Sequence, residues 1–278
     1  MSAEVLDTNL QTYDREDVAA HYGSLEYLSP CERLLFETYI SRGGAILDLG
    51  VGGGRTTPYL AEGAARYVGI DYADAMVKIC RVKFPRLEFL VADAADLSMF
   101  GDESFDSVVF AFNGIDYLQP DQRRQACLRQ IHRVLKPCGS VIFSSHNPRS
   151  VVARPSWNED RVSRIAGRWA GQSTSLRGAF HAAFVAGRIV LAYMQAVAAS
   201  VSRVIRRVPR RAFWRGQGYW VDSAHGGLQT HYAVPSRVFA EGAAIGLKPV
   251  RLLGDDFPRK SHLFITDWYY YVFTKPKK

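Results

Sequence analysis

The 278-residue sequence predicts an α/β fold in which helices cover both faces of a mostly parallel sheet. Short apolar runs that fit buried strands alternate with segments of helical periodicity through the first half of the chain. The first run leads into a glycine-rich turn, and an aspartate ends or follows each of the next two. Parallel strands bring their carboxyl ends to one edge of a sheet, and ligands bind at that edge in such folds. The sequence therefore predicts a fold class and the edge at which a site lies.

The order of the predicted elements follows from these runs. Apolar spacing between residues 10 and 40 predicts one or two helices ahead of the sheet. Further helices are expected at 74–83, 121–135 and 235–246, the second starting at Asp121 after a proline. The expected strands complete a seven-stranded sheet with its last strand antiparallel: 45–49, 67–71, 87–92, 105–112, 140–144, 248–253 and 262–274.

The positive charge of the chain is concentrated in one segment. The net charge is +8, but residues 149–215 hold thirteen Arg, no Lys and two acids, so the rest of the chain sums to −3. We expect three regions: N-terminal helices with the first part of the core at 1–147, a basic and aromatic insert at 148–232, and the completion of the core sheet at 233–278.

The remaining composition favours a cytoplasmic protein. The N-terminal residues lack the charged, then apolar, then small pattern of a secretory signal. The longest apolar run, Ile189–Val201, has 13 residues, whereas a membrane-spanning helix needs about 20. Four cysteines are scattered without the close pairs of zinc sites or disulfide frameworks, so no metal site is predicted.

The glycine turn is the strongest signal for a ligand site. Asp48 ends the first predicted strand and is followed by Gly50, Gly52 and Gly54. Glycines without a Cβ let the backbone approach a ligand closely, and the next helix offers free N–H groups. Dinucleotide-binding domains make a similar turn. Here Arg55 stands where their third Gly or Ala should be, which disfavours that alternative.

Polar residues also follow the later strands. Asp71 ends the second predicted strand, 21 residues after Gly50, where a carboxylate can accept both hydroxyls of a ribose. Asp93 follows the third strand, and Asn113 follows the fourth. Any one of these can be an ordinary loop residue. Together they predict a nucleoside-type ligand along the sheet edge.

The segments LDLGVGGG, VGIDYADAMV, FLVADAADL, FDSVVFAFNGIDYL and VLKPCGSVIFSSHN resemble successive motifs of small-molecule class I S-adenosylmethionine-dependent methyltransferases, over about residues 45–147. The resemblance implies a Rossmann-like seven-stranded sheet. It also implies S-adenosyl-L-methionine as cofactor and S-adenosyl-L-homocysteine as product. Cys138 departs from the glycine that is commoner in its turn.

The resemblance also implies roles for individual residues. Asp48, Gly50 and Gly52 would line the methionine part of the cofactor, with Asn113 near the same end, and Asp71 would bind the ribose. The adenine would lie between Tyr72 and Ala94 with Asp93 at its amino group, closed over by Tyr13 and Tyr22.

The acceptor is suggested by a shorter match. Residues 220–226, followed by Thr230-His231-Tyr232, resemble a segment of methyltransferases encoded among polysaccharide and natural-product biosynthesis genes. The resemblance implies methylation of a hydroxyl on a sugar-like, glycolipid or natural-product acceptor. Such a hydroxyl needs a base, for which histidine is the usual residue. We expect His225 first and His146 second, with Asp222 or Asp116 as the orienting carboxylate; each histidine can alternatively satisfy loop backbone.

The basic insert leaves three alternatives open. Residues 188–215 could form a basic amphipathic helix on the inner face of a membrane, bind a phosphorylated or lipid-linked substrate, or be a solvated lid. A small-amine N-methyltransferase and an RNA methyltransferase remain alternative functions. Phe112-Asn113-Gly114-Ile115 lacks the Asn/Asp-Pro-Pro-aromatic motif of base-amine methyltransferases, which disfavours nucleic acid as the partner. A nicotinamide oxidoreductase and a cofactor-binding scaffold without activity are the other rivals, and the oligomeric state stays open.

Overall fold

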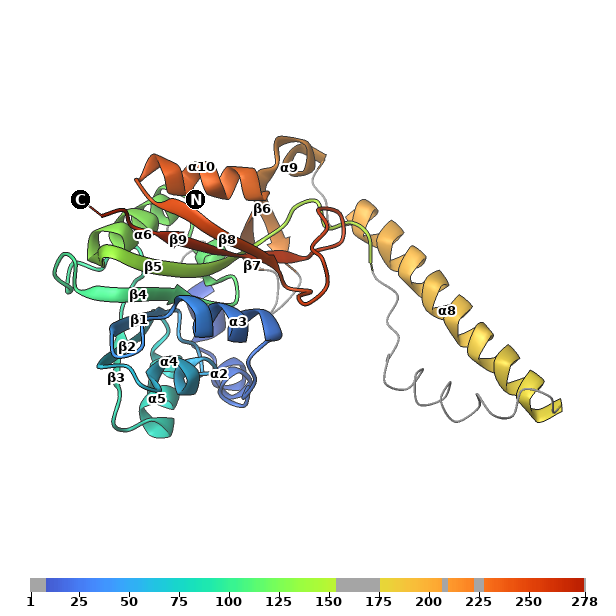
Figure 1. The fold of residues 1–278 in the computed structure, drawn as a ribbon, viewed down its shortest axis with the longest axis horizontal. Helices are drawn as coiled ribbons and strands as arrows, with labels where there is room; N and C mark the ends of the chain where they lie inside the picture. The colour runs from blue at the N-terminus through green and yellow to red at the C-terminus, as the bar shows by residue number, and fades with distance from the viewer. Residues whose placement is uncertain (1–8, 154–175, 207–209, 223–227, 278) are drawn as a thin grey trace.

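A central sheet with helices on both faces forms the body of the protein (Figure 1). The computed structural model describes residues 9–153, 176–206, 210–222 and 228–277. Its strands are β1 (Ala45–Leu49), β2 (Arg66–Asp71), β3 (Glu88–Val91), β4 (Phe105–Phe110), β5 (Leu135–His146), β6 (Gln217–Asp222), β7 (Leu228–Ala233), β8 (Lys248–Gly254) and β9 (Trp268–Thr274). Its helices are α2 (Glu16–Gly23), α3 (Pro30–Tyr39), α4 (Thr57–Ala61), α5 (Asp74–Lys83), the 3-10 helix η1 (Gly114–Tyr117), α6 (Asp121–Val134), α8 (Leu176–Arg206), α9 (Arg210–Arg215) and α10 (Pro235–Ala244).

The predicted fold class is confirmed. The strand order is β3-β2-β1-β4-β5, all parallel, and β9 pairs antiparallel with β5 and then with β8. This is the Rossmann-like arrangement that the alternating strands and helices predict. It brings the carboxyl ends of β1, β2, β3, β4 and β5 to one edge.

The predicted number of strands was too small, because the sheet has nine strands among the described residues. The two additional strands, β6 and β7, form an antiparallel hairpin. They fall inside the predicted insert 148–232, where no strand was expected. β7 joins the sheet at His146, which pairs with Tyr232 beyond the last residue of β5 that pairs with β4. The hairpin therefore extends the sheet at the edge where a ligand would bind.

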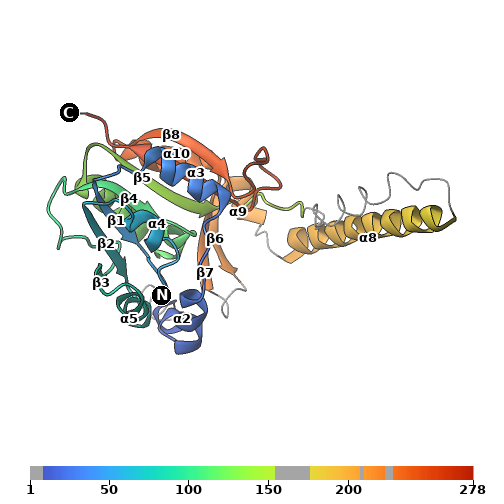
Figure 2. The same ribbon diagram turned by 60° about the horizontal axis from the view of Figure 1, so that its bottom comes forward.

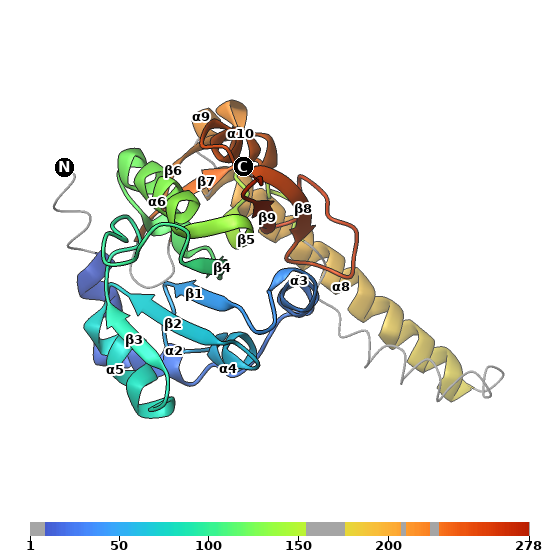
Figure 3. The same cartoon turned by 60° about the vertical axis from the view of Figure 1, so that its left-hand side comes forward.

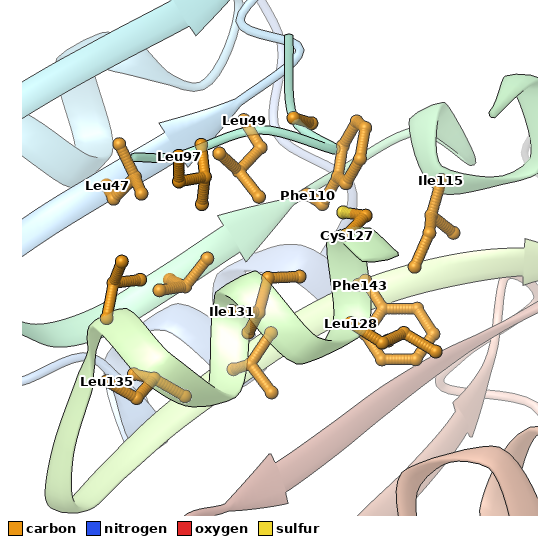
Figure 4. Packing of buried hydrophobic residues seen from close by; sticks show 14 of the residues in the cluster. Leu47, Leu49, Leu97, Phe110, Ile115, Cys127, Leu128, Ile131, Leu135 and Phe143 are labelled. Atoms are coloured by element: carbon orange, nitrogen blue, oxygen red, sulfur yellow. The ribbon is translucent and has the colours of Figure 1, made fainter. Parts of the chain in front are cut away.

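The two faces of the sheet are buried by different helices. Leu47 and Leu49 of β1 point to one face, where they pack in a cluster with Leu128 and Ile131 of α6 (Figure 4). Ile46, between them in sequence, belongs to the opposite cluster with residues of α3, α4 and α5. Figure 3 shows α4 and α5 on the other side of the sheet from α6. Burial on both faces explains why these strands are continuous apolar runs.

Helix α8 is the one described helix that extends away from the body in every view (Figures 1, 2 and 3). It has 31 residues, far more than the apolar run in its sequence indicates. The prediction that this region is too short to cross a membrane was wrong about length. Residues 185–202 are long and apolar enough to do so by length and composition alone, and only 6% of that window is buried.

The glycine turn after β1 is packed against the N-terminal helix α2. A Cβ on Gly53 would lie 2.3 Å from the backbone N of Gly23 and 2.4 Å from the backbone C of Tyr22. Real Cβ atoms do not come this close to backbone, so an alanine would push the end of α2 away from the turn.

We predict that Gly53→Ala lowers the free energy of unfolding by about 1–3 kcal/mol, the usual cost of overpacking. Gly101→Ala is the matched control, because nothing lies within 4 Å of the Cβ that it would add. Thermal or urea unfolding of both variants measures the difference. Equal stability of the two variants would show that α2 does not rest on the turn.

Candidate functional site

A cavity of about 270 Å³ opens at the carboxyl edge of the sheet. Nine of the ten residues predicted to bind a cofactor line it, and they come from the N-terminal segment, the glycine turn and the ends of β2, β3 and β4: Tyr13, Tyr22, Gly50, Gly52, Asp71, Tyr72, Asp93, Ala94 and Asn113. Residues far apart in the sequence therefore meet at the edge that the strand order predicts.

Asp71 is held rigidly at the end of β2. Its Oδ1 accepts a hydrogen bond from the backbone N of Ala73 (3.0 Å), and its Oδ2 accepts one from the backbone N of Gly52 (2.9 Å). Burial raises the pKa of Asp71 to about 6, although the backbone donors oppose this shift. Each oxygen has a further lone pair, so the carboxylate can accept two neighbouring hydroxyls of a ribose.

Asp48 does not line the cavity, which corrects the role expected for it. Strand alternation puts its side chain on the same face as Ile46, toward α4, where it is 1% exposed. Its Oδ2 accepts hydrogen bonds from Thr56 Oγ1 (3.0 Å) and Tyr67 Oη (2.9 Å). Burial raises the pKa of Asp48 to about 7 against the effect of these two donors. Asp48 thus connects Thr56, which follows the glycine turn, to Tyr67 of β2 on the side of the sheet away from the cavity.

At the end of the cavity near β3, the carboxylate of Asp93 already has partners within the protein. Asp93 Oδ1 accepts a hydrogen bond from the backbone N of Ala95 (2.9 Å), and its Oδ2 pairs with the guanidinium of Arg123. The predicted adenine contact must therefore share Asp93 with an arginine that also lines the cavity.

Five buried polar atoms of residues that line the cavity have no hydrogen-bond partner among the described residues. They are Asn9 Oδ1, Tyr72 Oη, Asn113 Oδ1, Arg123 Nε and Trp268 Nε1. Unsatisfied buried polar groups are rare and indicate a missing ligand or water. Tyr72 lies in the region expected for the adenine and Asn113 in the region expected for the methionine part. Together with the Asp71 carboxylate, these atoms fit a nucleoside joined to a polar amino-acid chain.

Arg55 is a cavity residue that the sequence prediction missed as a functional residue. Its guanidinium binds both carboxylate oxygens of Glu32, at 2.5 and 2.8 Å, and donates to the backbone O of Tyr27. It also lies 5.2 Å from the ring centroid of Phe112. The sequence did mark Arg55 as unusual, because it stands where a dinucleotide-binding turn has its third glycine. The ion pair with Glu32 could not be predicted from the sequence. A glutamate three residues after Ser29 predicts only a capping box, which Glu32 does form.

The methionine end of the cavity lies beside a fully buried aspartate. Asp116, in η1, accepts hydrogen bonds at Oδ1 from Arg124 Nη1 (2.9 Å) and Ser145 Oγ (2.7 Å). Its Oδ2 accepts from the backbone N of His146 (2.7 Å). Burial opposes ionisation of Asp116, but the hydrogen bond to His146, the proximity of His231 and the positive charge of Arg124 hold the pKa of Asp116 well below its usual range.

His146 connects this buried network to the cavity. Its ring Nδ1 lies 2.9 Å from Asp116 Oδ2, and its Nε2 lies 3.2 Å from Asn113 Nδ2. An ionised Asp116 favours the tautomer with hydrogen on Nδ1. Nε2 is then an acceptor, consistent with the amide hydrogen of Asn113 pointing toward it. His146 lines the cavity, and its side chain is 15% exposed.

The structure thus brings together two of the four predicted catalytic residues, His146 and Asp116. His225, the first choice as base, lies outside the described residues, and of Asp222 only the backbone pairing with Leu228 is described. The predicted catalytic set did not include His231, whose Nδ1 lies 3.7 Å from Asp116 Oδ1. Nor did it include Arg124, because only tertiary folding brings these groups to Asp116.

Comparisons with known proteins identify a methyltransferase domain in this chain. Residues 46–139 match the family model described as a methyltransferase domain. The demethylmenaquinone methyltransferase of Clavibacter sepedonicus is 36% identical over 104 residues, which are 36% of this chain and 40% of that protein. The chain spans about half, or less, of the length of the curated relatives it matches first.

Solved structures share the fold at low sequence identity. The CcbJ methyltransferase of Streptomyces caelestis has a TM-score of 0.58 and 16% identity, covering 95% of this chain and 98% of its own. The 1,6-didemethyltoxoflavin-N1-methyltransferase of Burkholderia thailandensis, solved with bound S-adenosylhomocysteine, has a TM-score of 0.52 and 14% identity, covering 89% and 77%.

The family match covers the glycine turn, Asp71, Asp93 and Asn113, the residues around which the cavity is built. Residues 46–139 match a methyltransferase domain, and the fold is the one shared by solved S-adenosylmethionine-dependent methyltransferases.

Proposed function

We propose that the protein transfers a methyl group from S-adenosylmethionine to a hydroxyl of a small sugar-like, glycolipid or natural-product acceptor, with His146 as general base. The observation that carries this proposal is the contact of His146 with Asp116 on one side and the cavity on the other. A histidine held by a carboxylate, with its second nitrogen directed to a site, is the usual arrangement for removing a proton from a hydroxyl.

When bound, S-adenosylmethionine supplies an electrophilic methyl carbon and leaves as S-adenosylhomocysteine. His146 Nε2 takes the proton of the acceptor hydroxyl while that oxygen forms its bond to the methyl carbon. Asp71 and the glycine turn would hold the cofactor, whose sulfur would keep the electron pair of its bond to the methyl carbon. The Asp116 carboxylate stabilises the imidazolium that forms. Asn113 positions the ring through its contact with Nε2, a contact that the acceptor hydroxyl must share or displace.

The cofactor half of the cavity provides binding and orientation. Asp71 accepts the ribose hydroxyls, and the glycine turn allows close approach of the backbone. Positioning the two reactants in line supplies much of the rate enhancement in such a displacement. Tyr13, Tyr22 and Tyr117 line the same cavity.

The pairing of His146 with Asp116 favours a hydroxyl acceptor over an amine. A neutral amine already presents a lone pair, so it gains less from a base than a hydroxyl does. The sugar-like class rests on the resemblance of residues 220–226. Strand β7, which follows that segment in the sequence, lies beside η1 at the edge of the sheet where the cavity opens. The reaction is expected in the cytoplasm.

We predict that His146→Asn lowers kcat by about 10²–10⁴-fold, the usual contribution of a general base. The asparagine amide can still donate to Asp116, so the fold is retained while the base is lost. Turnover is measured with isotope-labelled S-adenosylmethionine on a panel of sugars, phenols and amines, and the dissociation constant of S-adenosylhomocysteine should change by less than about threefold.

The matched control is His132→Asn, on α6 and away from the cavity lining. It should leave turnover unchanged. A loss in His146→Asn no larger than in this control would reject His146 as the base. Turnover on amines alone, insensitive to His146, would replace the proposal with N-methylation.

We predict that the affinity for S-adenosylhomocysteine falls at acid pH. Asp71 must be ionised to accept two hydroxyls, and burial raises its pKa to about 6. Binding is therefore complete above this pH and weakens as pH falls through it, by about tenfold at one pH unit below the pKa. Calorimetric titration between pH 5 and 8 measures the slope.

Asp71→Asn is the control for this pH dependence. Its affinity should be lower at neutral pH and nearly independent of pH in the same range. An equal slope in both proteins would assign the titration to another group.

A further inference from the structure

Helix α8 presents an apolar stripe that no described part of the chain covers. Val190, Met194, Val197 and Val201 recur at helical spacing and are 57%, 63%, 61% and 52% exposed. Among residues 185–202, only Ala192 and Ala196 are buried. Four large apolar side chains on one exposed face mark an interaction surface.

The body holds one end of this helix. Ser200 Oγ accepts a hydrogen bond from the backbone N of Ala153 (2.9 Å), and the backbone N–H groups of Val151 and Val152 donate to the carbonyl of Phe264. The other end, at Leu176, lies far from the body in all three views (Figures 1, 2 and 3). The stripe is therefore presented outward on a tethered helix.

The charge of the region selects one kind of partner. Residues 161–221 contain eleven Arg and no Asp, Glu or Lys. Within α8, positions 177, 188 and 206 are 11 and 18 residues apart, which places them on one line of the helix, and Arg188 is exposed. That line lies on the opposite side of the helix from the apolar stripe, because residues 190, 194, 197 and 201 are rotated by about 180–240° from residue 188. A helix with one apolar face and arginines on its other face is complementary to an anionic membrane surface, where the apolar face enters the interface and the basic face lies at headgroup level.

The topology disfavours a membrane-spanning α8. The chain leaves the body at Ala153 and is back at it by Ser200, so one crossing by α8 would require a second by residues 154–175. That segment contains four Arg, one Glu and one Asp, so its composition does not suit the hydrocarbon core. A second copy of the chain is also disfavoured, because residues 161–221 of each copy carry eleven Arg and no acidic residue, so the two regions would repel each other as a whole.

We propose that α8 docks the protein on an anionic membrane surface, with the stripe Val190, Met194, Val197 and Val201 in the interface and the arginines at lipid phosphates. This surface lies outside the methyltransferase cavity, and the inference does not rest on the proposed reaction. It provides a way to hold the enzyme beside acceptors that reside in a membrane.

The test is co-sedimentation of the full chain with vesicles of phosphatidylcholine alone and of phosphatidylcholine with phosphatidylglycerol. Wild type should bind the anionic vesicles at least about tenfold more tightly and should lose this preference in high salt. Combined Val190→Ser, Met194→Gln and Val197→Ser substitutions should weaken binding by at least about tenfold. Arg188→Gln should weaken binding to anionic vesicles by about fivefold.

The matched control combines Val82→Ser and Met99→Gln, which change apolar side chains of the body that are 82% and 53% exposed. It should bind vesicles as wild type does. Unchanged S-adenosylhomocysteine affinity in the α8 variants would show that they are folded.

Four outcomes would overturn the proposal. The first is wild type that binds neither vesicle, and the second is wild type that binds both vesicles equally. A dimer that the α8 substitutions dissociate, without vesicle binding, would assign the stripe to a second copy. Membrane-bound protein that resists alkaline extraction would indicate that α8 spans the bilayer.

Discussion

The carboxylate of Asp116 has no exposed surface, and hydrogen bonds to it connect η1 with α6 and with the end of β5. Arg124, on α6, also binds Glu241 of α10 at 3.1 Å, so the network reaches a second helix on the same face of the sheet. A buried charge is tolerated only when it is paired and hydrogen-bonded, and removing one partner typically costs about 3–5 kcal/mol. The ligand-binding edge of the sheet is therefore fixed by one ionised group.

This network also determines what the cavity can do. Because Asp116 stays ionised, it fixes the ring of His146 and leaves Nε2 on the cavity side. The cofactor half is built differently, since the Asp71 carboxylate and the glycine turn are tied to each other by a backbone N–H. In the proposed mechanism, cofactor binding and proton removal thus depend on separate carboxylates, Asp71 at the end of β2 and Asp116 in η1 after β4. They should respond differently to substitution and to pH.

Local pattern was sufficient to place Asp71 and the glycines at the lining of the cavity. Asp71 and the glycines lie at strand ends that apolar runs define, and the parallel order then places them at one edge. Asp48 shows the limit of such reasoning. Its position in sequence suggested the cavity, but strand alternation turns it toward Thr56 and Tyr67. Spacing gives the order of residues along the chain, and the face on which each lies depends on packing.

The acceptor side depended on contacts between distant residues. Asp116 and His146 are 30 residues apart, and Asp116 and Arg124 meet only because η1 and α6 pack beside β5. The β6–β7 hairpin was hidden within an arginine-rich and aromatic region, where alternation is weak. The length of α8 was underestimated for a related reason, since Arg188 and Gln195 interrupt its apolar run without interrupting the helix.

The central claim is that His146, held by Asp116, faces the methyl group to be transferred. A crystal structure with S-adenosylhomocysteine bound is the most direct measurement. We expect His146 Nε2 within about 5 Å of the position that the methyl group would occupy, directly or through one water, with Nδ1 still on Asp116. A structure in which another side chain holds that position and His146 is turned away would contradict the account.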